Sequence, residues 1–304
     1  MTFPHPEPPR FDRPPRSDRL FSHEQFSAEE LVERKGDQTI TVALPARDEA
    51  TTIGPILERI VTELIDGVPL LDELLVIDDL SEDDTAAIAE KAGATVHSSA
   101  EILPEYGSGG KGEALWKSLH ISTGDLITWC DADIKNFDNR FVLGVLGPLL
   151  TNPAVGFVKG FYRRPLNDEG EGGGRVTELM ARPLIATLFP ALGTMVQPLS
   201  GEFGGRRQLL TQVPFARGYA VDLALLIDLS DSFGADVLAQ VDLGSRVHRN
   251  RPLRQLGPQA AAILAMALSR GGLPELENPL IMARPEFGDA EITIGNLPPL
   301  SDLK

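Results

Sequence analysis

The stretch Leu126-Ile127-Thr128-Trp129-Cys130-Asp131-Ala132-Asp133 is an apolar, β-prone run that ends in two aspartates one residue apart. In an extended backbone, residues i and i+2 point to the same side, so Asp131 and Asp133 are expected to present their carboxylates together. Open α/β sheets bind ligands at the carboxyl ends of their strands. Two carboxylates there suit Mg²⁺ or Mn²⁺ held jointly with a diphosphate. For Asp-x-Asp alone, a strand that ends in a solvated acidic turn is the commoner interpretation.

Strands and helices are expected to alternate ahead of this stretch. Ser27 and Glu30 form a capping-box pattern that opens a short helix. Apolar spacing predicts strands at Thr39–Leu44, Glu73–Ile77 and Thr95–His97, and helices at Thr52–Leu64, Asp83–Ala92 and Glu113–Leu119. Pro45–Glu49 is expected to be a loop. This alternation predicts an α/β fold with a Rossmann-like, mostly parallel sheet flanked by helices.

The second half of the chain is expected to continue with longer elements. The patterns predict strands at Val155–Arg163 and Val237–Val247, and helices at Gly218–Phe233 and Gln255–Ser269. Residues 1–24 carry many Pro and Arg without an apolar period, which indicates a flexible or loosely docked arm. The last thirty or so residues are Pro-rich and are expected to be irregular.

Composition excludes several classes of protein. The 304 residues are 42% hydrophobic and 24% charged, with a net charge of −16, which argues against binding to nucleic acid or anionic membranes. A single cysteine, Cys130, cannot form an intramolecular disulfide and fits a reducing compartment. The apolar runs Phe141–Leu150 and Ala260–Leu268 are shorter than the roughly 20 residues that span a bilayer. With no apolar signal segment at the N-terminus, a cytoplasmic location is expected.

The Gly-rich loop Gly107–Gly112 is not a standard nucleotide-binding loop. Gly112 follows Lys111 where a P-loop requires Ser or Thr, and no Gly-x-Gly-x-x-Gly directly follows the first strand. Lys111 at a helix start can still meet an anion or a base carbonyl. A flexible loop with a solvated lysine is an equally good interpretation.

Basic residues gather late in this acidic chain, which suggests capture of a small anion. They are Lys159, Arg163, Arg164, Arg175, Arg182, Arg246, His248, Arg249, Arg251 and Arg254. If residues 246–250 are extended, Arg246, His248 and Asn250 share one face, and His248 could complete a metal site opened by the aspartates. A purely structural role for His248 fits the sequence as well. Residues 172–177 combine three glycines with Arg175 and Thr177, a composition that can grip a phosphate or form a surface loop.

Seven blocks in order resemble the glucosyl-3-phosphoglycerate synthases, a family of retaining GT-A glycosyltransferases. They are Leu-Pro-Ala-Arg-Asp-Glu (44–49), Asp-Asp-Leu-Ser-Glu-Asp-Asp-Thr (78–85), Gly-Lys-Gly-Glu-Ala-Leu-Trp (110–116), Asp-Ala-Asp (131–133), Gly-Gly-Gly-Arg-Val-Thr-Glu-Leu (172–179), Gln-Pro-Leu-Ser-Gly-Glu (197–202) and His-Arg-Asn-Arg-Pro-Leu (248–253). The resemblance covers about residues 28–272. Its fifth and seventh blocks are far more specific than Asp-x-Asp, which many transferases share.

The resemblance implies transfer of a hexose, with glucose from UDP-glucose favoured, to the 2-hydroxyl of 3-phosphoglycerate, with retention. It places the donor at Pro45, Ala46, Glu49, Asp79, Lys111, Asp131 and Ala132. It places the acceptor at Gly174, Arg175, Thr177 and Asn250. It assigns Asp133, Asp222 and Leu199 to the reacting centre, and Asp133 and His248 to Mg²⁺, Mn²⁺ or Co²⁺. It also implies a homodimer and these regions: an arm at 1–26, donor-binding and acceptor-binding parts of one GT-A domain at 27–150 and 151–272, and a tail at 273–304 that is a candidate dimer contact.

At three positions the residue differs from the one that is usual in the family. Asp79 stands where a small Ser is usual in the nucleotide pocket, Asp48 replaces the common Asn, and Asp222 stands where Glu is usual. These departures leave open a mannosyl-3-phosphoglycerate synthase that uses GDP-mannose. The sequence also leaves open a polyprenyl-phosphate glycosyltransferase, a sugar-phosphate nucleotidyltransferase and a non-catalytic module that binds a nucleotide sugar.

Overall fold

A computed structural model describes residues 19–303 of the chain, apart from 165–173, 248–252 and 275. Its centre is an eight-stranded sheet in the order β1-β9-β6-β7-β5-β2-β3-β4. The strands are β1 Leu20–Ser22, β2 Ile40–Ala46, β3 Glu73–Asp78, β4 Thr95–Ser98, β5 Leu126–Trp129, β6 Phe157–Arg163, β7 Phe203–Arg206 and β9 Leu238–Ser245. The predicted α/β class is therefore confirmed.

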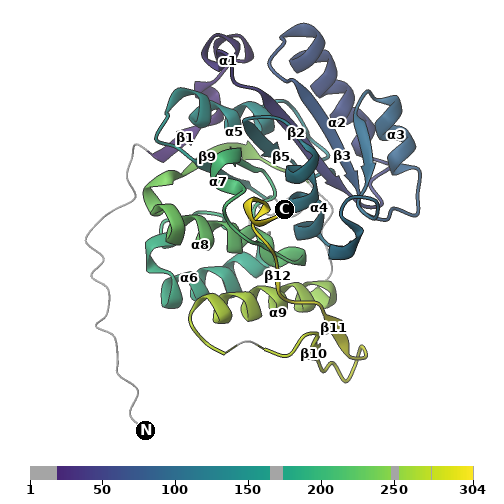
Figure 1. Ribbon diagram of the computed structural model, residues 1–304, viewed down its shortest axis with the longest axis vertical. Coiled ribbons are helices and arrows are strands. Elements are labelled where there is room, and N and C mark those ends of the chain that lie inside the picture. Colours follow the sequence, from purple (N-terminus) through teal and green to yellow (C-terminus); the bar gives the residue numbers. More distant parts are fainter. Residues whose placement is uncertain (1–18, 165–173, 248–252, 275, 304) are drawn as a thin grey trace.

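Helices cover both faces of the sheet (Figure 1). They are α1 Ala28–Lys35, α2 Ile53–Ile60, α3 Thr85–Lys91, α4 Lys111–Ile121, α5 Arg140–Thr151, α6 Arg182–Leu188, α7 Arg207–Leu210, α8 Val221–Phe233 and α9 Leu253–Arg270. Ser27 accepts a hydrogen bond from the Glu30 backbone N–H, so the predicted cap opens α1. Within the described residues, no helix has both the length and the apolar composition that crossing a membrane requires.

The alternation of side chains along β2 builds two cores. Val42 and Leu44 pack on one face of the sheet, against residues of α1, α2 and α5. Ala43 points to the other face, where α4 and α8 contribute Leu115 and Leu223. Each strand side chain thus lies on one of two helix-covered faces. Because both faces are buried, the strand sequences are nearly continuous apolar runs.

Strand β7 joins the two halves of the chain. It lies antiparallel between β5 and β6, while the other neighbouring strands of the sheet pair in parallel. The predicted donor and acceptor parts therefore share one sheet. The carboxyl ends of β2, β3 and β5 lie along one edge, which is where the sequence predicts the site.

Two predictions about the chain ends need correction. Leu20–Ser22 was expected to belong to a loose arm but forms β1, which pairs in parallel with β9. The C-terminal region was expected to be irregular but contains a β10–β11 hairpin, Leu280–Met282 with Ala290–Ile292. It also contains β12 (Asn296–Leu297), which pairs with β8 (Phe215–Ala216). In Figure 1 this last segment runs from the β10–β11 hairpin back toward α4.

Candidate active site

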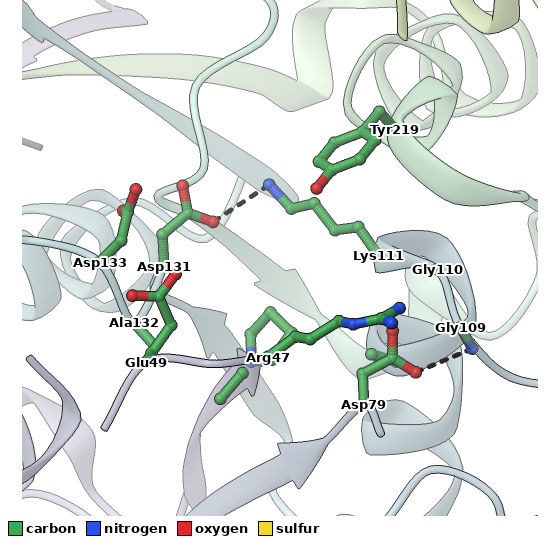
Figure 2. A pocket seen from close by; sticks show the side chains of 13 residues that line it. Arg47, Glu49, Asp79, Gly109, Gly110, Lys111, Asp131, Ala132, Asp133 and Tyr219 are labelled. Carbon is green, nitrogen blue, oxygen red and sulfur yellow. Dashed lines mark hydrogen bonds and ion pairs between the residues drawn. The ribbon is translucent and has the colours of Figure 1, made fainter. Parts of the chain in front are cut away.

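A cavity of about 250 Å³ opens at the carboxyl edge of the sheet. The end of β2, the residue after β3, the start of α4 and the segment after β5 all contribute to it (Figure 2). It is lined by Pro45, Ala46, Arg47, Glu49, Asp79, Gly109, Gly110, Lys111, Ala114, Asp131, Ala132, Asp133 and Tyr219. The seven residues predicted to bind the donor are all in this lining, as is Asp133. Pro45 and Ala46 belong to β2 rather than to the predicted loop.

Asp131 and Asp133 come together, although not by the predicted geometry. Strand β5 ends at Trp129, and Ala132 and Asp133 lie in a turn, so the two aspartates are not alternate residues of one strand. The buried guanidinium of Arg246 joins them: its Nη2 lies 2.9 Å from Asp131 Oδ2 and 2.5 Å from Asp133 Oδ1. Their carboxylates are 25% and 27% exposed. Two partly open carboxylates that already converge on one cation are a donor set that fits a divalent metal ion.

Gly201 allows this arrangement because a Cβ at that position would overlap with the Asp131 carboxylate. The next residue, Glu202, is fully buried, and its Oε1 lies 3.4 Å from Arg246 Nε. Tyr162 accepts a hydrogen bond from Arg246 Nη1 at 2.9 Å. Burial raises the pKa of Glu202, although Arg246 opposes that shift. The Asp-x-Asp turn therefore rests on a buried polar layer.

Asp222 lies between two lysines. Lys111 Nζ is 3.3 Å from Asp222 Oδ1 and 3.2 Å from Asp131 Oδ1, and Lys159 Nζ is 3.4 Å from Asp222 Oδ1. Burial lowers the pKa of Lys159 to about 8, with Asp222 opposing the shift. Burial also disfavours charged Lys111, but Asp131 and Asp222 outweigh it and raise the pKa of Lys111. Lys159 is thus part of the wall behind Asp222 and not a free anion-binding residue, which corrects its predicted role.

Asp79 lies at the opposite end of the cavity. Its Oδ1 accepts hydrogen bonds from Ser99 Oγ at 2.7 Å and from the Gly109 backbone N–H at 2.9 Å. Burial raises the pKa of Asp79. Arg47 extends toward this carboxylate (Figure 2) and lowers its pKa in part. No donor to Asp79 Oδ2 is found among the described residues, so this oxygen is available to a ligand.

The Gly-rich loop is fixed in place by residues of α4. The buried Lys117 donates to the carbonyl oxygens of Ser99, at 2.6 Å, and of Gly107. Glu113 accepts from the Gly218 backbone N–H at 3.0 Å and pairs with Arg217 at 3.1 Å. The interpretation as a loop with a solvated lysine is therefore wrong: the loop is anchored, and Lys111 is paired at the cavity.

Sequence reasoning missed five lining residues, which are Arg47, Gly109, Gly110, Ala114 and Tyr219. All lie beside residues that were predicted. Arg47 directly follows Pro45 and Ala46. Gly109 and Gly110 precede Lys111 in the loop, and Ala114 follows it in helix α4. Tyr219 had only its position three residues before Asp222 as a signal.

Of the predicted acceptor residues, three are described. Gly174 has φ +82° and precedes a helical segment whose turn Thr177–Ala181 is π-helical and continues into α6. Thr177 is buried, and a Cβ on Gly174 would lie 3.8 Å from it. Gly174, Arg175 and Thr177 do not line the cavity, nor does Leu199, which packs against the core. Asn250 and His248 lie outside the described residues, and within these no three His, Cys, Asp or Glu side chains converge to hold a metal ion.

Comparisons with known proteins identify the family of the chain. The family model for glycosyl transferase family 2 matches residues 41–213. Glucosyl-3-phosphoglycerate synthase of Mycolicibacterium paratuberculosis is 49% identical over 85% of this chain and 80% of its own length. The synthase of Petrotoga mobilis is 47% identical over 83% of this chain and 80% of its own. The chain belongs to the glucosyl-3-phosphoglycerate synthase family.

Solved structures of this synthase family are also similar. The crystal structure of the Mycobacterium tuberculosis glucosyl-3-phosphoglycerate synthase in complex with Mn²⁺, UDP-glucose and phosphoglyceric acid is 43% identical, with a TM-score of 0.83. The match covers 92% of this chain and 96% of that one. The structure of the same enzyme with Mg²⁺ and UDP has a TM-score of 0.84 at 42% identity. The predicted glycosyltransferase fold and family are therefore confirmed.

Proposed function

We propose that this synthase transfers glucose from UDP-glucose to the 2-hydroxyl of 3-phosphoglycerate, with retention of the anomeric configuration. The observation that carries the proposal is that one cavity contains every predicted donor residue. The relatives' names specify the same product, and a neighbouring structure contains UDP and glucosyl-3-phosphoglycerate. The proposal rests on the site as well as on that likeness.

The nucleobase is expected at the Asp79 end of the cavity. Asp79 Oδ2 can accept one N–H from uracil, and the Asp79 carboxylate is held by Ser99 and Gly109. Pro45 and Ala46 provide an apolar wall that a flat base can cover. Glu49 lies farther along the same wall, where a ribose hydroxyl would be in reach of an acidic acceptor.

The diphosphate is expected at the Asp131–Asp133 end. Asp133 and His248 would hold a divalent metal ion, which when bound neutralises charge on the departing diphosphate. Lys111 holds Asp131 in place at this end of the cavity, where Asp131 lies beside the ribose and the sugar. In this proposal Asp133 is the metal ligand and Asp131 contacts the donor.

Asp222 positions the sugar in this proposal. Lys111 and Lys159 both hold its carboxylate, so it is fixed in place as a hydrogen-bond acceptor for sugar hydroxyls. The carboxylates of Asp131 and Asp133 are held by Lys111 and Arg246 and are assigned to the donor and the metal rather than to covalent catalysis. We therefore favour attack of the acceptor hydroxyl on the same face of the sugar as the leaving group, with the leaving phosphate taking the acceptor proton.

The acceptor is assigned to Gly174, Arg175, Thr177 and Asn250. The positive φ of Gly174 starts a helical segment, whose first backbone N–H groups and nearby Arg175 are suited to a phosphate or carboxylate. Leu199 lies in a turn with Pro198, and we assign it to the reacting centre through its backbone.

We also expect a homodimer in the cytoplasm. Exposed apolar side chains gather in the C-terminal region, at Leu273, Leu276, Ile281 and Phe287. A partner subunit would cover them and remove their apolar surface from water, which favours association. Light scattering after size-exclusion chromatography measures the mass, and a monomer at micromolar concentration would contradict this expectation.

The deciding experiment is a donor comparison. Purified protein with Mg²⁺ and 3-phosphoglycerate is given UDP-glucose, GDP-glucose or GDP-mannose, and NMR reads the sugar and the anomeric configuration of the product. UDP-glucose is expected to react fastest and to give the α-glucoside. A β-glucoside would overturn retention, and preference for GDP-mannose would overturn the donor. Donor binding without release of diphosphate would indicate a binding module.

The acceptor assignment has its own test. Arg175→Ala is expected to raise the KM for 3-phosphoglycerate by about tenfold or more, because a hydrogen bond between charged groups contributes roughly 1.5–3 kcal/mol. Arg34→Ala is the control, since Arg34 pairs with Glu30 at a solvent-exposed position outside the site. Equal KM values for the two variants would place the acceptor elsewhere.

A further inference from the structure

Arg246 is the most enclosed cation next to the Asp-x-Asp turn. Its side chain is 3% exposed and lies just beyond the end of β9, two positions before His248 in the sequence. One nitrogen, Nη2, contacts both aspartates at 2.9 and 2.5 Å. The other two nitrogens face Tyr162 OH at 2.9 Å and Glu202 Oε1 at 3.4 Å. Nη1 and Nη2 therefore form hydrogen bonds inside the protein, whereas Nε, although buried, makes only an ion-pair contact with Glu202.

The charges around it explain why a cation is needed there. Asp131, Asp133 and Glu202 place three carboxylates around one guanidinium, and Lys111 reaches only Asp131 among them within ion-pair distance. Asp133 has no ion-pair partner other than Arg246 among the described residues. Without Arg246, like charges at this spacing would repel, and the buried Glu202 would lose its compensating charge.

We propose that Arg246 is the internal counter-ion of the Asp-x-Asp pair: it holds both carboxylates in place before a divalent ion binds and competes with that ion for Asp133. This inference rests on the proposed function, because it takes Asp133 as a metal ligand. Arg246 is a positioning residue and does not touch substrate. Since the guanidinium occupies Asp133 Oδ1, the nucleotide-free protein binds Mn²⁺ weakly, and the negative diphosphate of the donor restores tight binding.

Titration of the nucleotide-free protein with Mn²⁺, followed by electron paramagnetic resonance of the free ion, tests the competition without using activity. The variant E202Q/R246M removes one positive and one negative charge. Because Arg246 contacts Asp133 directly and Glu202 does not, Mn²⁺ is expected to bind about tenfold or more tightly than to the native protein. If the double variant fails to fold, R246Q is measured instead. It keeps polar groups toward Glu202 and is also expected to bind Mn²⁺ more tightly than the native protein.

Two further variants separate the possible failures. R163M removes a cation from the end of β6, where only the backbone carbonyl of Arg163 contacts Arg246, and it is expected to leave Mn²⁺ affinity unchanged. D133N is expected to abolish Mn²⁺ binding. If D133N abolishes binding but neither Arg246 variant tightens it, the counter-ion role is wrong and the metal assignment stands. If D133N binds Mn²⁺ normally, the proposed metal ligand is wrong, and the inference fails with it.

Discussion

Gly201 shows how tightly the donor site is built at the level of single residues. The Asp131 carboxylate occupies the space in which any other residue would carry its Cβ. The requirement is for space, because Gly201 is not among the glycines with positive φ. The position of Asp131 therefore depends on a residue that contributes no chemistry.

Gly201→Ala is expected to displace Asp131 and to lower kcat/KM for the donor by about a hundredfold, since a shift of roughly 1 Å in a positioned group has an effect of that size. Overpacking should also lower the free energy of unfolding by about 1–3 kcal/mol. Steady-state kinetics and thermal melting measure the two effects. Gly257→Ala in α9 is the control, because its Cβ would make an ordinary contact at 3.4 Å with Met282. Equal kinetics in both variants would contradict the prediction.

Lys159 predicts a pH dependence of stability. Its folded pKa of about 8 lies below the ordinary 10.5 because of burial, so the unfolded chain binds the proton more strongly. The penalty for charged Lys159 is fully present below pH 8 and disappears as the pH rises toward 10.5. Between these values the native protein should gain roughly 3 kcal/mol of unfolding free energy relative to Lys159→Met. Urea denaturation of both proteins at pH 7.5 and 10 measures this difference. An equal change in unfolding free energy in the native protein and in Lys159→Met would refute the prediction.

Residue types alone could predict the donor side but not its ion pairs. Pro45, Asp79 and Asp131 lie at or just after the ends of strands that apolar periodicity defines, and Lys111 begins a helix, so the topology brings them to one edge. The contact of Arg246 with both aspartates depends on where β9 ends and on the turn after β5. Neither is encoded in the local spacing of residues, and Arg246 was accordingly interpreted as an anion-binding residue.

At the level of elements, the predicted ones were those with a clear period and clear ends. Helix α5 (Arg140–Thr151) was missed because its apolar residues face packing partners nearly all round and leave no polar stripe. Strand β7 (Phe203–Arg206) contains two adjacent glycines, which disfavour a strand prediction. Its close approach to Thr128 of β5 is what requires Gly204. Tertiary packing, and not local sequence, determines the secondary structure of both segments.

From the contacts of strand β12 we predict that the C-terminal segment stabilises the elements that carry the site. Leu297 is fully buried, Pro298 accepts from Trp116 Nε1 at 2.8 Å, and the Arg217 N–H donates to Gly295 at 3.0 Å. Leu297→Ala is therefore expected to lower the free energy of unfolding by about 2–5 kcal/mol. Leu179→Ala, at a position that is 77% exposed, should change it by less than about 0.5 kcal/mol. Chemical denaturation compares the two, and similar losses would show that β12 adds little.

At the scale of the whole molecule, both halves of the chain are built around one eight-stranded sheet with a large core on each face. Because β7 inserts between β5 and β6, strands from residues 151–272 complete the sheet that residues 27–150 begin. Asp222 on α8 is tied in turn to Lys111 on α4 and Lys159 on β6. The sequence did predict one domain with two parts, but it could not show this interlocking, because the pairing partners lie far apart along the chain.

A single cooperative unfolding transition is therefore expected. Trp116 and Trp129 are buried in one of the two cores, so their fluorescence reports on that face, while far-UV circular dichroism reports on both. The two signals should coincide across a urea titration, and the fragments 27–150 and 151–272 should not fold when expressed separately. Two separated transitions would show that the halves are independent.

The pairing of β12 with β8 has a consequence for the order in which the protein is made. The residues that line the donor cavity lie between positions 45 and 219 and leave the ribosome first. The backbone that leads into Asp222 is then held by Gly295 and Leu297, which are synthesised after all of these residues. A nascent chain can thus possess every residue of its donor site and still lack the support behind Asp222. Chains that are released before residues 295–297 are made are therefore expected to lack activity, although their donor site is complete in sequence.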